Sequence, residues 1–229
     1  KISLSGFNVH ELEVLEEIEF DNKLTHSHWL GVTQQQDADD CINKFKTKKI
    51  DWLIVDHYAL DFQWQKRLKP YCKKLMVIDD LADRNHQCDI LLDQTFGRQQ
   101  EDYLRQTSRG CKLLLGSKYA LLRPEFSKWR SYSLERRCKP KFKQLLISMG
   151  GVDVDNVTEK ILDELRICNL PSDLKIIVVM GGLTPYLESV KSKATALPCK
   201  TQIKVDVDNM AEIMANSDMA IGAAGTTTW

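Results

Sequence analysis

Three polar side chains follow one apolar run and could do chemistry together. Asp56, His57 and Tyr58 come directly after the largely apolar segment 50–55. In open α/β sheets, ligands gather outside the carboxyl ends of strands. His57 could exchange a proton near neutral pH, Asp56 could orient it or bind a sugar hydroxyl, and Tyr58 could donate to a phosphate or acyl oxygen. The structural alternative is that Asp56 caps the next turn while Tyr58 packs beneath the loop.

A second apolar run, Leu75–Ile78, ends in a cluster of charged side chains. Asp79, Asp80 and Asp83 are followed at once by Arg84. Three carboxylates could hold a divalent metal, but adjacent aspartates on a strand point to opposite faces, so we do not expect a metal site. We expect one aspartate to bind loop amides, and Arg84 to pair with an acid or reach a substrate.

A third run repeats this arrangement, because Asp93 and Gln94 directly follow Ile90–Leu92. Parallel strands end at the same edge of their sheet, so the three polar groups should meet there. We therefore predict that Asp79, Asp80 and Arg84 bind substrate beside Asp56, His57 and Tyr58.

Small residues follow two strand-like runs in the second half of the chain. Gly150 and Gly151 would let a ligand or a neighbouring loop approach the backbone, although a plain turn would need no ligand. Gly225 and Thr226–Thr228 stand where a helix should begin. Free amides and the helix dipole favour a phosphate at such a position, and an ordinary threonine cap is the alternative.

The elements that must position these residues alternate between strand and helix patterns. Residues 39–46 and 157–165 have apolar side chains at helical spacing, which predicts amphipathic helices. Short apolar runs between such segments indicate buried parallel strands, and the alternation predicts an α/β fold. The runs are 53–55, 75–78, 90–92, 145–147, 176–179 and 219–221.

A polar, basic stretch over residues 128–143 separates two similar halves. It has little periodic apolar content and precedes a new strand, turn and helix pattern, so we predict a domain boundary there. The expected domains cover residues 1–130 and 141–229.

Composition excludes several classes of protein. Lys and Arg equal Asp and Glu at 32 each, which argues against a general nucleic-acid binder. The 7 cysteines form no CxxC pair, so we expect free thiols in a reducing cytoplasm. His26 and His28 lack a third ligand at recognisable spacing, and solvated loop histidines are the favoured interpretation. No apolar run approaches the length of a membrane span, and no membrane partner is expected.

Five ordered motifs resemble the UDP-2,4-diacetamido-2,4,6-trideoxy-β-L-altropyranose hydrolase family of bacterial pseudaminic-acid synthesis. The resemblance extends from about residue 30 to the end of the chain, where segment 220–229 looks like the family's nucleotide-diphosphate loop. The motifs are Val55–Tyr58, Ile78–His86, Cys88–Gln94, Gly116–Phe126 and Met149–Asp153.

The resemblance implies a GT-B-like fold, with two Rossmann-type domains facing across a cleft, as in the UDP-N-acetylglucosamine transferase of peptidoglycan synthesis. It implies a cytoplasmic hydrolase without metal or cofactor, in which water attacks the anomeric carbon with inversion and releases UDP. Tyr58 would bind sugar or phosphate with support from Asp56 and His57. Residues 225–228 would lie near the diphosphate, and Val205, Val207 and Met210 near uracil.

Two departures from the family pattern qualify this expectation. Nothing in the chain matches the family's Gly-x-Gly-His loop, whose histidine is expected before Lys1, and a ribose-binding glutamate is expected beyond Trp229. The chain would then be incomplete at both ends and could lack activity by itself. A glycosyltransferase of the same fold and a non-catalytic nucleotide-sugar-binding fragment remain alternatives.

Overall fold

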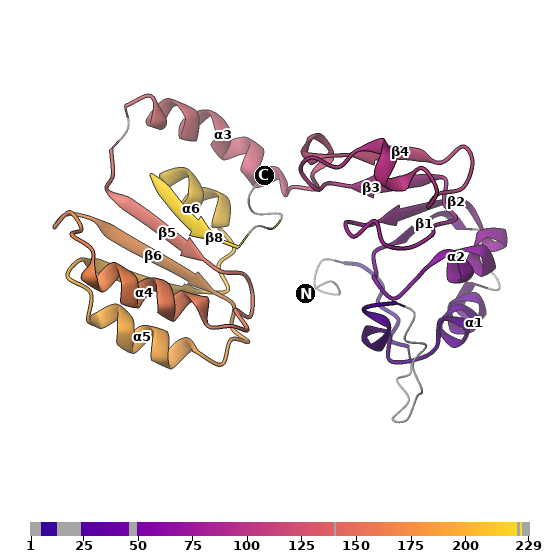
Figure 1. The fold of residues 1–229 in the computed structure, drawn as a ribbon, viewed down its shortest axis with the longest axis horizontal. Coiled ribbons are helices and arrows are strands. Elements are labelled where there is room, and N and C mark those ends of the chain that lie inside the picture. The colour runs from indigo at the N-terminus through magenta and orange to yellow at the C-terminus, as the bar shows by residue number, and fades with distance from the viewer. Residues whose placement is uncertain (1–5, 13–23, 46–49, 140, 224, 226–229) are drawn as a thin grey trace. The chain divides into compact units, whose positions relative to one another are not determined.

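The computed structural model describes residues 6–12, 24–45, 50–139, 141–223 and 225. The chain divides into two compact units, residues 1–120 and 121–229. Each unit contains a parallel four-stranded sheet with helices packed against it (Figure 1). The predicted α/β class is therefore confirmed. In the described part of the chain, no helix is long and apolar enough to cross a membrane.

The sheet of the first unit has its strands in chain order. Ile78 lies beside Leu92, and Asp93 lies beside Leu115, so the strands end at a common edge. The order is β1 (Ile50–Val55), β2 (Cys72–Ile78), β3 (Ile90–Asp93) and β4 (Lys112–Leu115), with helices α1 (Gln34–Phe45) and α2 (Phe62–Leu68).

A capped helix and a buried tryptophan fix α1 and α2 to each other. Asp61 caps α2 by accepting a hydrogen bond of 2.8 Å from the Gln63 amide. The buried Trp64 donates its indole N–H to Asp37 of α1 at 2.6 Å. This bond satisfies two polar groups that packing of α2 against the sheet would otherwise leave buried without partners.

Loops rather than α-helices join β2 to β3 and β3 to β4. Parallel neighbours are usually joined by a helical crossover. Here residues 79–89 and 94–111 make the connections, and their helical content is the short 3₁₀ helix η4 (Gln100–Tyr103). The interior beneath these loops is consequently filled by loop side chains, many of them polar.

The sheet of the second unit is covered by helices of different extent on its two faces. Leu145 and Ile147 of β5 pack with Leu162 of α4, whereas Leu146 faces Ile213 of α6. The α4 and α5 helices therefore share one face, and α6 lies on the other (Figure 1). The order is β7 (Lys200–Val205), β6 (Lys175–Met180), β5 (Gln144–Ser148) and β8 (Met219–Gly222), with α4 (Val157–Ile167), α5 (Leu187–Thr195) and α6 (Met210–Asn216).

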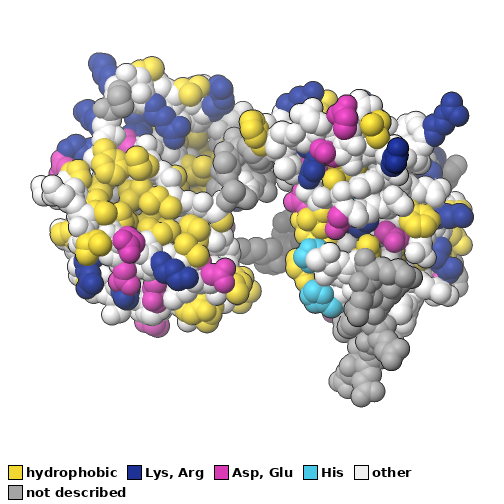
Figure 2. Space-filling model, in the orientation of Figure 1, with side chains coloured by type: hydrophobic (Ala, Val, Ile, Leu, Met, Phe, Trp, Pro, Cys, Tyr) yellow, Lys and Arg dark blue, Asp and Glu magenta, His cyan; other side chains and the backbone are white. Residues whose placement is uncertain are grey.

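Apolar side chains remain exposed on this unit. Figure 2 shows them gathered on its visible face. Val152, Leu183 and Met219 are among the exposed large apolar residues of the unit.

The stretch expected as a linker is largely helical. Helix α3 covers Pro124–Arg137, and the division between the units falls between residues 120 and 121. Arg136 donates to the carbonyl of Ala215 at 3.0 Å and pairs with Asp218, which also accepts from the Gln144 amide at 2.8 Å. These bonds fasten α3 to the second unit.

Candidate functional site

Tyr58 and Asp80 form an accessible polar pair at the carboxyl edge of the first sheet. Tyr58 is half-buried and Asp80 is exposed. Burial raises the pKa of Tyr58, and the nearby Asp80 carboxylate raises that pKa further. Tyr58 is therefore a neutral donor at physiological pH. The structure thus brings together residues that follow β1 and β2, as the sequence predicted for this edge.

His57 is held in one tautomer by the backbone. Its Nδ1 accepts a hydrogen bond of 3.1 Å from the Ala59 amide, so the neutral ring carries its proton on Nε2. Burial lowers the pKa of His57, against the opposing charge of Asp37 and with a further lowering by Arg84. At neutral pH the ring is uncharged and offers an N–H donor, because its lone pair on Nδ1 is already occupied.

Asp56 is exposed beside this pair and does not cap the next helix. Asp61 fills that position, with its carboxylate bound to the Gln63 amide. The negative charge of Asp56 raises the pKa of both His57 and Tyr58. Its contribution at this edge is therefore electrostatic.

Asp79 and Arg84 lie beneath the surface and bind each other. The guanidinium Nη1 lies 2.8 Å from Asp79 Oδ1, and both side chains are almost completely buried. Arg84 also donates through Nε to the carbonyl of Leu60 at 3.1 Å and through Nη1 to Asp83 at 2.9 Å. Two of the three carboxylates considered for a metal are thus paired with one arginine.

Interactions with neighbouring groups keep Asp79 ionised. Burial raises the pKa of Asp79, but contacts with His86, Arg84 and Tyr103 outweigh it, so the pKa lies well below its ordinary value. His86 Nδ1 lies 3.0 Å from the amide nitrogen of buried Gln65, and its Nε2 faces Asp79 Oδ2 at 3.7 Å. The pair therefore belongs to a wider buried network.

Tyr103 is a member of this network that was not predicted from the sequence. Its side chain is fully buried, and its hydroxyl lies 2.7 Å from Asp79 Oδ2 and 2.8 Å from Asp93 Oδ2. Arg98 and Gln65 were missed as well. The available signal was a single aromatic residue within the polar segment 98–109, between two apolar strands.

His26 is not the solvated loop residue that the sequence suggested. Its ring lies 5.3 Å from the ring of Tyr58 and 4.5 Å from that of Trp29, and it is half-buried. His28 is exposed, as expected. Because Trp29 also lies 5.7 Å from Tyr58, the rings of His26, Trp29 and Tyr58 form one aromatic cluster.

Loops at the carboxyl edge of the second sheet meet through glycines. Gly150 adopts a φ of 92°, which favours glycine. A Cβ on Gly181 would overlap the carbonyl of Gly151, so the loops after β5 and β6 touch backbone to backbone. The Gly182 amide donates to Asp206 at 2.8 Å. Gly181 and Gly182 were missed, although Met-Gly-Gly occurs twice in the sequence, at 149–151 and 180–182.

Replacement of Gly181 by alanine is expected to destabilise the second unit by about 1–3 kcal/mol, because the added methyl group would collide with the Gly151 backbone. The matched control is Gly151→Ala, whose added Cβ would meet nothing within 4 Å. Urea denaturation of both variants measures the difference. Equal midpoints for the two variants would contradict the close approach of these loops.

The carboxylate of Asp153 occupies the start of α4. It accepts hydrogen bonds from the amides of Val157 and Thr158, each at 2.9 Å. Burial raises the pKa of Asp153, but these bonds to Thr158 and Val157 outweigh it and lower the pKa. An anion bound near Gly150 and Gly151 would therefore not use these two amides.

The remaining predicted nucleotide contacts lie on other strand ends of this unit. Val205 ends β7 and is exposed, whereas Val207 and Met210 are half-buried and pack on the cluster of Leu146 and Ile213. Gly225 is exposed. Thr226, Thr227 and Thr228 lie outside the described residues.

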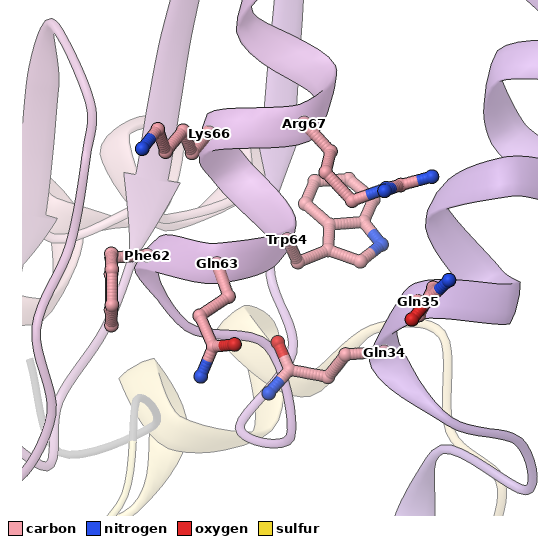
Figure 3. A pocket seen from close by; sticks show the side chains of 7 residues that line it. All are labelled: Gln34, Gln35, Phe62, Gln63, Trp64, Lys66 and Arg67. Carbon is pink, nitrogen blue, oxygen red and sulfur yellow. The ribbon is translucent and has the colours of Figure 1, made fainter.

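Two pockets are lined by residues other than those predicted. One of about 370 Å³ lies between α1 and α2 of the first unit (Figure 3). The other, of about 530 Å³, lies between α3 and α6 of the second unit and includes Trp129, Arg130 and Met214. The pocket in Figure 3 is lined by Gln34, Gln35, Phe62, Gln63, Trp64, Lys66 and Arg67.

The chain is similar in sequence to several known proteins. The chain is 29% identical over 188 residues to the UDP-2,4-diacetamido-2,4,6-trideoxy-beta-L-altropyranose hydrolase of Campylobacter jejuni, covering 82% of this chain and 64% of that protein. It is 24% identical over 212 residues to the spore coat polysaccharide biosynthesis protein SpsG of Bacillus subtilis, covering 90% of this chain and 60% of SpsG. No protein-family model matches the chain.

Two further similarities concern the extent of the chain and its fold. The uncharacterized protein MJ1062 of Methanocaldococcus jannaschii is 29% identical over 230 residues, which are 98% of this chain and 47% of that protein. The chain thus spans about half to two thirds of the length of these relatives. The crystal structure of Acinetobacter baumannii MurG matches 99% of the chain and 60% of MurG, with a TM-score of 0.54 and 12% identity. That match shows the fold alone: two Rossmann-like α/β units.

Proposed function

We propose that this chain forms part of an enzyme that processes a nucleotide-linked sugar, and that its reaction is hydrolysis of a UDP-sugar. The observation that carries the proposal is the similarity to the Campylobacter hydrolase across 82% of the chain, in both units. The name of the SpsG relative points to the synthesis of a surface polysaccharide.

The accessible residues of the first unit supply the sugar contacts in this proposal. His57 offers an N–H, Tyr58 a hydroxyl and Asp80 an exposed carboxylate. Two donors and one acceptor of this kind match the hydroxyl and acetamido groups of a diacetamido sugar. Asp56 sets the local charge, while Asp79 and Arg84 support the loop from below instead of touching the substrate.

The second unit supplies the nucleotide contacts. Gly150, Gly151 and Gly225 are exposed, and their backbone amides would bind the diphosphate together with Thr226–Thr228, which lie outside the described residues. Val205, Val207 and Met210 would line the uracil. Amides that hold the diphosphate would stabilise the negative charge on the leaving UDP.

The proposed reaction breaks the bond between the anomeric carbon and the diphosphate oxygen. Water attacks that carbon with inversion, the bonding electrons leave with UDP, and one proton is released. The products are UDP and 2,4-diacetamido-2,4,6-trideoxy-L-altrose. We assign the enzyme to cytoplasmic pseudaminic-acid synthesis, without a metal or cofactor. His57 is assigned as a donor to the sugar and not as the base.

Isotope labelling tests the reaction and the bond that breaks. The chain is incubated with the UDP-linked diacetamido sugar in water enriched in ¹⁸O, and the masses of both products are measured by mass spectrometry. Attack at the anomeric carbon places one ¹⁸O in the free sugar and none in UDP. Tyr58→Phe is expected to slow this release, whereas Tyr71→Phe, at a tyrosine outside this edge, is the matched control.

The other outcomes are informative in different ways. Label in UDP would contradict attack at the anomeric carbon. UDP release that requires an added sugar acceptor would identify a glycosyltransferase. Calorimetric binding of UDP without turnover would leave a binding function, and absence of both would contradict the nucleotide site.

A further inference from the structure

The buried hydroxyl of Tyr103 joins two strands at the carboxyl edge of the first sheet. Asp79 directly follows β2, and Asp93 ends β3. Tyr103 comes from η4 in the long connection to β4, and its hydroxyl lies within 2.8 Å of both carboxylates. One side chain thus ties together residues that are 24 and 10 positions away in the sequence.

From Asp79, the chain of contacts runs to the loop after β1. Asp79 pairs with Arg84 at 2.8 Å, and Arg84 donates to the Leu60 carbonyl two residues beyond Tyr58. The Arg84 guanidinium carbon also lies 5.8 Å from the centre of the Tyr58 ring. Arg84 therefore contacts both the ring and the backbone of the Tyr58 loop.

From Asp93, a second chain of contacts runs to Asp80. Asp93 pairs with Arg98, and Arg98 donates through Nη2 to the carbonyl of Asp80 at 2.6 Å. The Asp80 carboxylate lies near Tyr58, and its negative charge raises the pKa of the Tyr58 hydroxyl. These contacts, which we call the Tyr103 contact network, thus run in two chains from Tyr103, one to the loop of Tyr58 and one to the backbone of Asp80.

We propose that Tyr103 is a positioning residue that fixes Tyr58 and Asp80 for substrate. This inference rests on the proposed function for what Tyr58 and Asp80 bind, but the positioning itself does not. No helix joins β2 to β3, so the Tyr103 contact network holds the loops at this edge in place. The hydroxyl of Tyr103, and not its aromatic ring, makes this link, because the hydroxyl contacts both Asp79 and Asp93. Without it each carboxylate would lose one of its partners in the buried interior.

Fluorine NMR tests the positioning without any substrate. The full chain is labelled with 3-fluorotyrosine at its 6 tyrosines, and the Tyr58 signal is identified by its loss in Tyr58→Phe. In Tyr103→Phe, the Tyr58 signal should shift or broaden, while the signals of Tyr71, Tyr119, Tyr132 and Tyr186 stay in place. Tyr71→Phe is the matched control and should leave the Tyr58 signal unchanged.

A folded Tyr103→Phe protein with an unmoved Tyr58 signal would overturn the proposal. If Tyr103→Phe does not fold, Arg98→Gln decides, because Arg98 is partly exposed and its loss breaks the link to Asp80. A shift of the Tyr58 signal in Arg98→Gln supports the proposed positioning, and an unchanged signal overturns it.

Kinetics separate this inference from the proposed function. Tyr103→Phe should lower kcat for the UDP-sugar by up to about a hundredfold, as small misplacements of binding groups do, while the affinity for UDP stays unchanged. If the unmodified chain neither binds nor hydrolyses the nucleotide sugar, the proposed function fails, but the fluorine signals still test the Tyr103 contact network. If kcat is unchanged while the Tyr58 signal moves, Tyr103 does position Tyr58, but the assigned contact between Tyr58 and the sugar is wrong.

Discussion

Substitution of Asp79 by alanine is expected to lower the free energy of unfolding by about 3–5 kcal/mol, the largest effect on stability that we expect from a single substitution. Asp79 is fully buried, and its removal leaves the guanidinium of Arg84 without its carboxylate at 2.8 Å. The Tyr103 hydroxyl and the Ala82 amide, which bind Asp79 at 2.7 and 3.0 Å, also lose their acceptor. Urea denaturation followed by tryptophan fluorescence measures the loss.

The same carboxylate predicts how stability depends on pH. The pKa of folded Asp79 is lowered, so its contribution to stability is present above the unfolded pKa of about 3.9 and is lost as the pH falls toward the folded value.

The matched control for Asp79→Ala is Asp51→Ala, because Asp51 pairs with Lys73 on the surface and its loss should change stability by less than about 1 kcal/mol. Equal losses in both variants would show that the buried ion pair contributes little.

Replacement of His57 by alanine is expected to lower kcat/KM for the UDP-sugar by about 10²–10³-fold, the effect of removing one fixed donor from a site. The donor is Nε2–H, which the Ala59 amide fixes by occupying Nδ1. His57→Gln keeps an N–H donor and should retain more activity. His28→Ala, at an exposed histidine, is the control.

The pH profile of kcat/KM distinguishes a donor from a general base at His57. Burial lowers the pKa of His57 below its ordinary value of 6.5, so the neutral donor form persists through neutral pH. Activity should stay level between about pH 6.5 and 8, and fall only at lower pH, when a proton on Nδ1 breaks the bond to Ala59. An activity limb near neutral pH that disappears in His57→Gln would contradict the donor role.

Most of the fold could be predicted from the sequence because apolar runs mark buried strands. Strands β1, β2, β3, β5, β6 and β8 all contain such runs. The edge strand β7 was missed because it begins with the polar residues Lys200, Thr201 and Gln202. The β4 strand was missed although its run of three leucines is as long as the run in β3. Helix α3 was missed because none of its residues is buried.

The site was predictable to the level of strand ends and no further. Asp56–Tyr58, Asp79–Asp80 and Asp93 do lie at one sheet edge, since parallel strands in register must end together. Whether each side chain faces solvent depends on partners from distant loops. Tyr103 and Arg98 belong to a connection without periodic pattern, so nothing in the local sequence indicated that Asp79 and Arg84 would be buried.

The buried pair of Asp79 and Arg84 also limits how this region can diverge among related proteins. Loss of either charge removes the buried partner of the other, although Arg84 keeps Asp83 and Asp79 keeps the Tyr103 hydroxyl, whereas joint replacement by apolar residues of similar volume can be nearly neutral. Evolutionary paths that change one member alone therefore cross an unstable intermediate. We expect the two positions to covary among related proteins. We also expect the sequences of the loops that they hold to change more slowly than is usual for loops of this length.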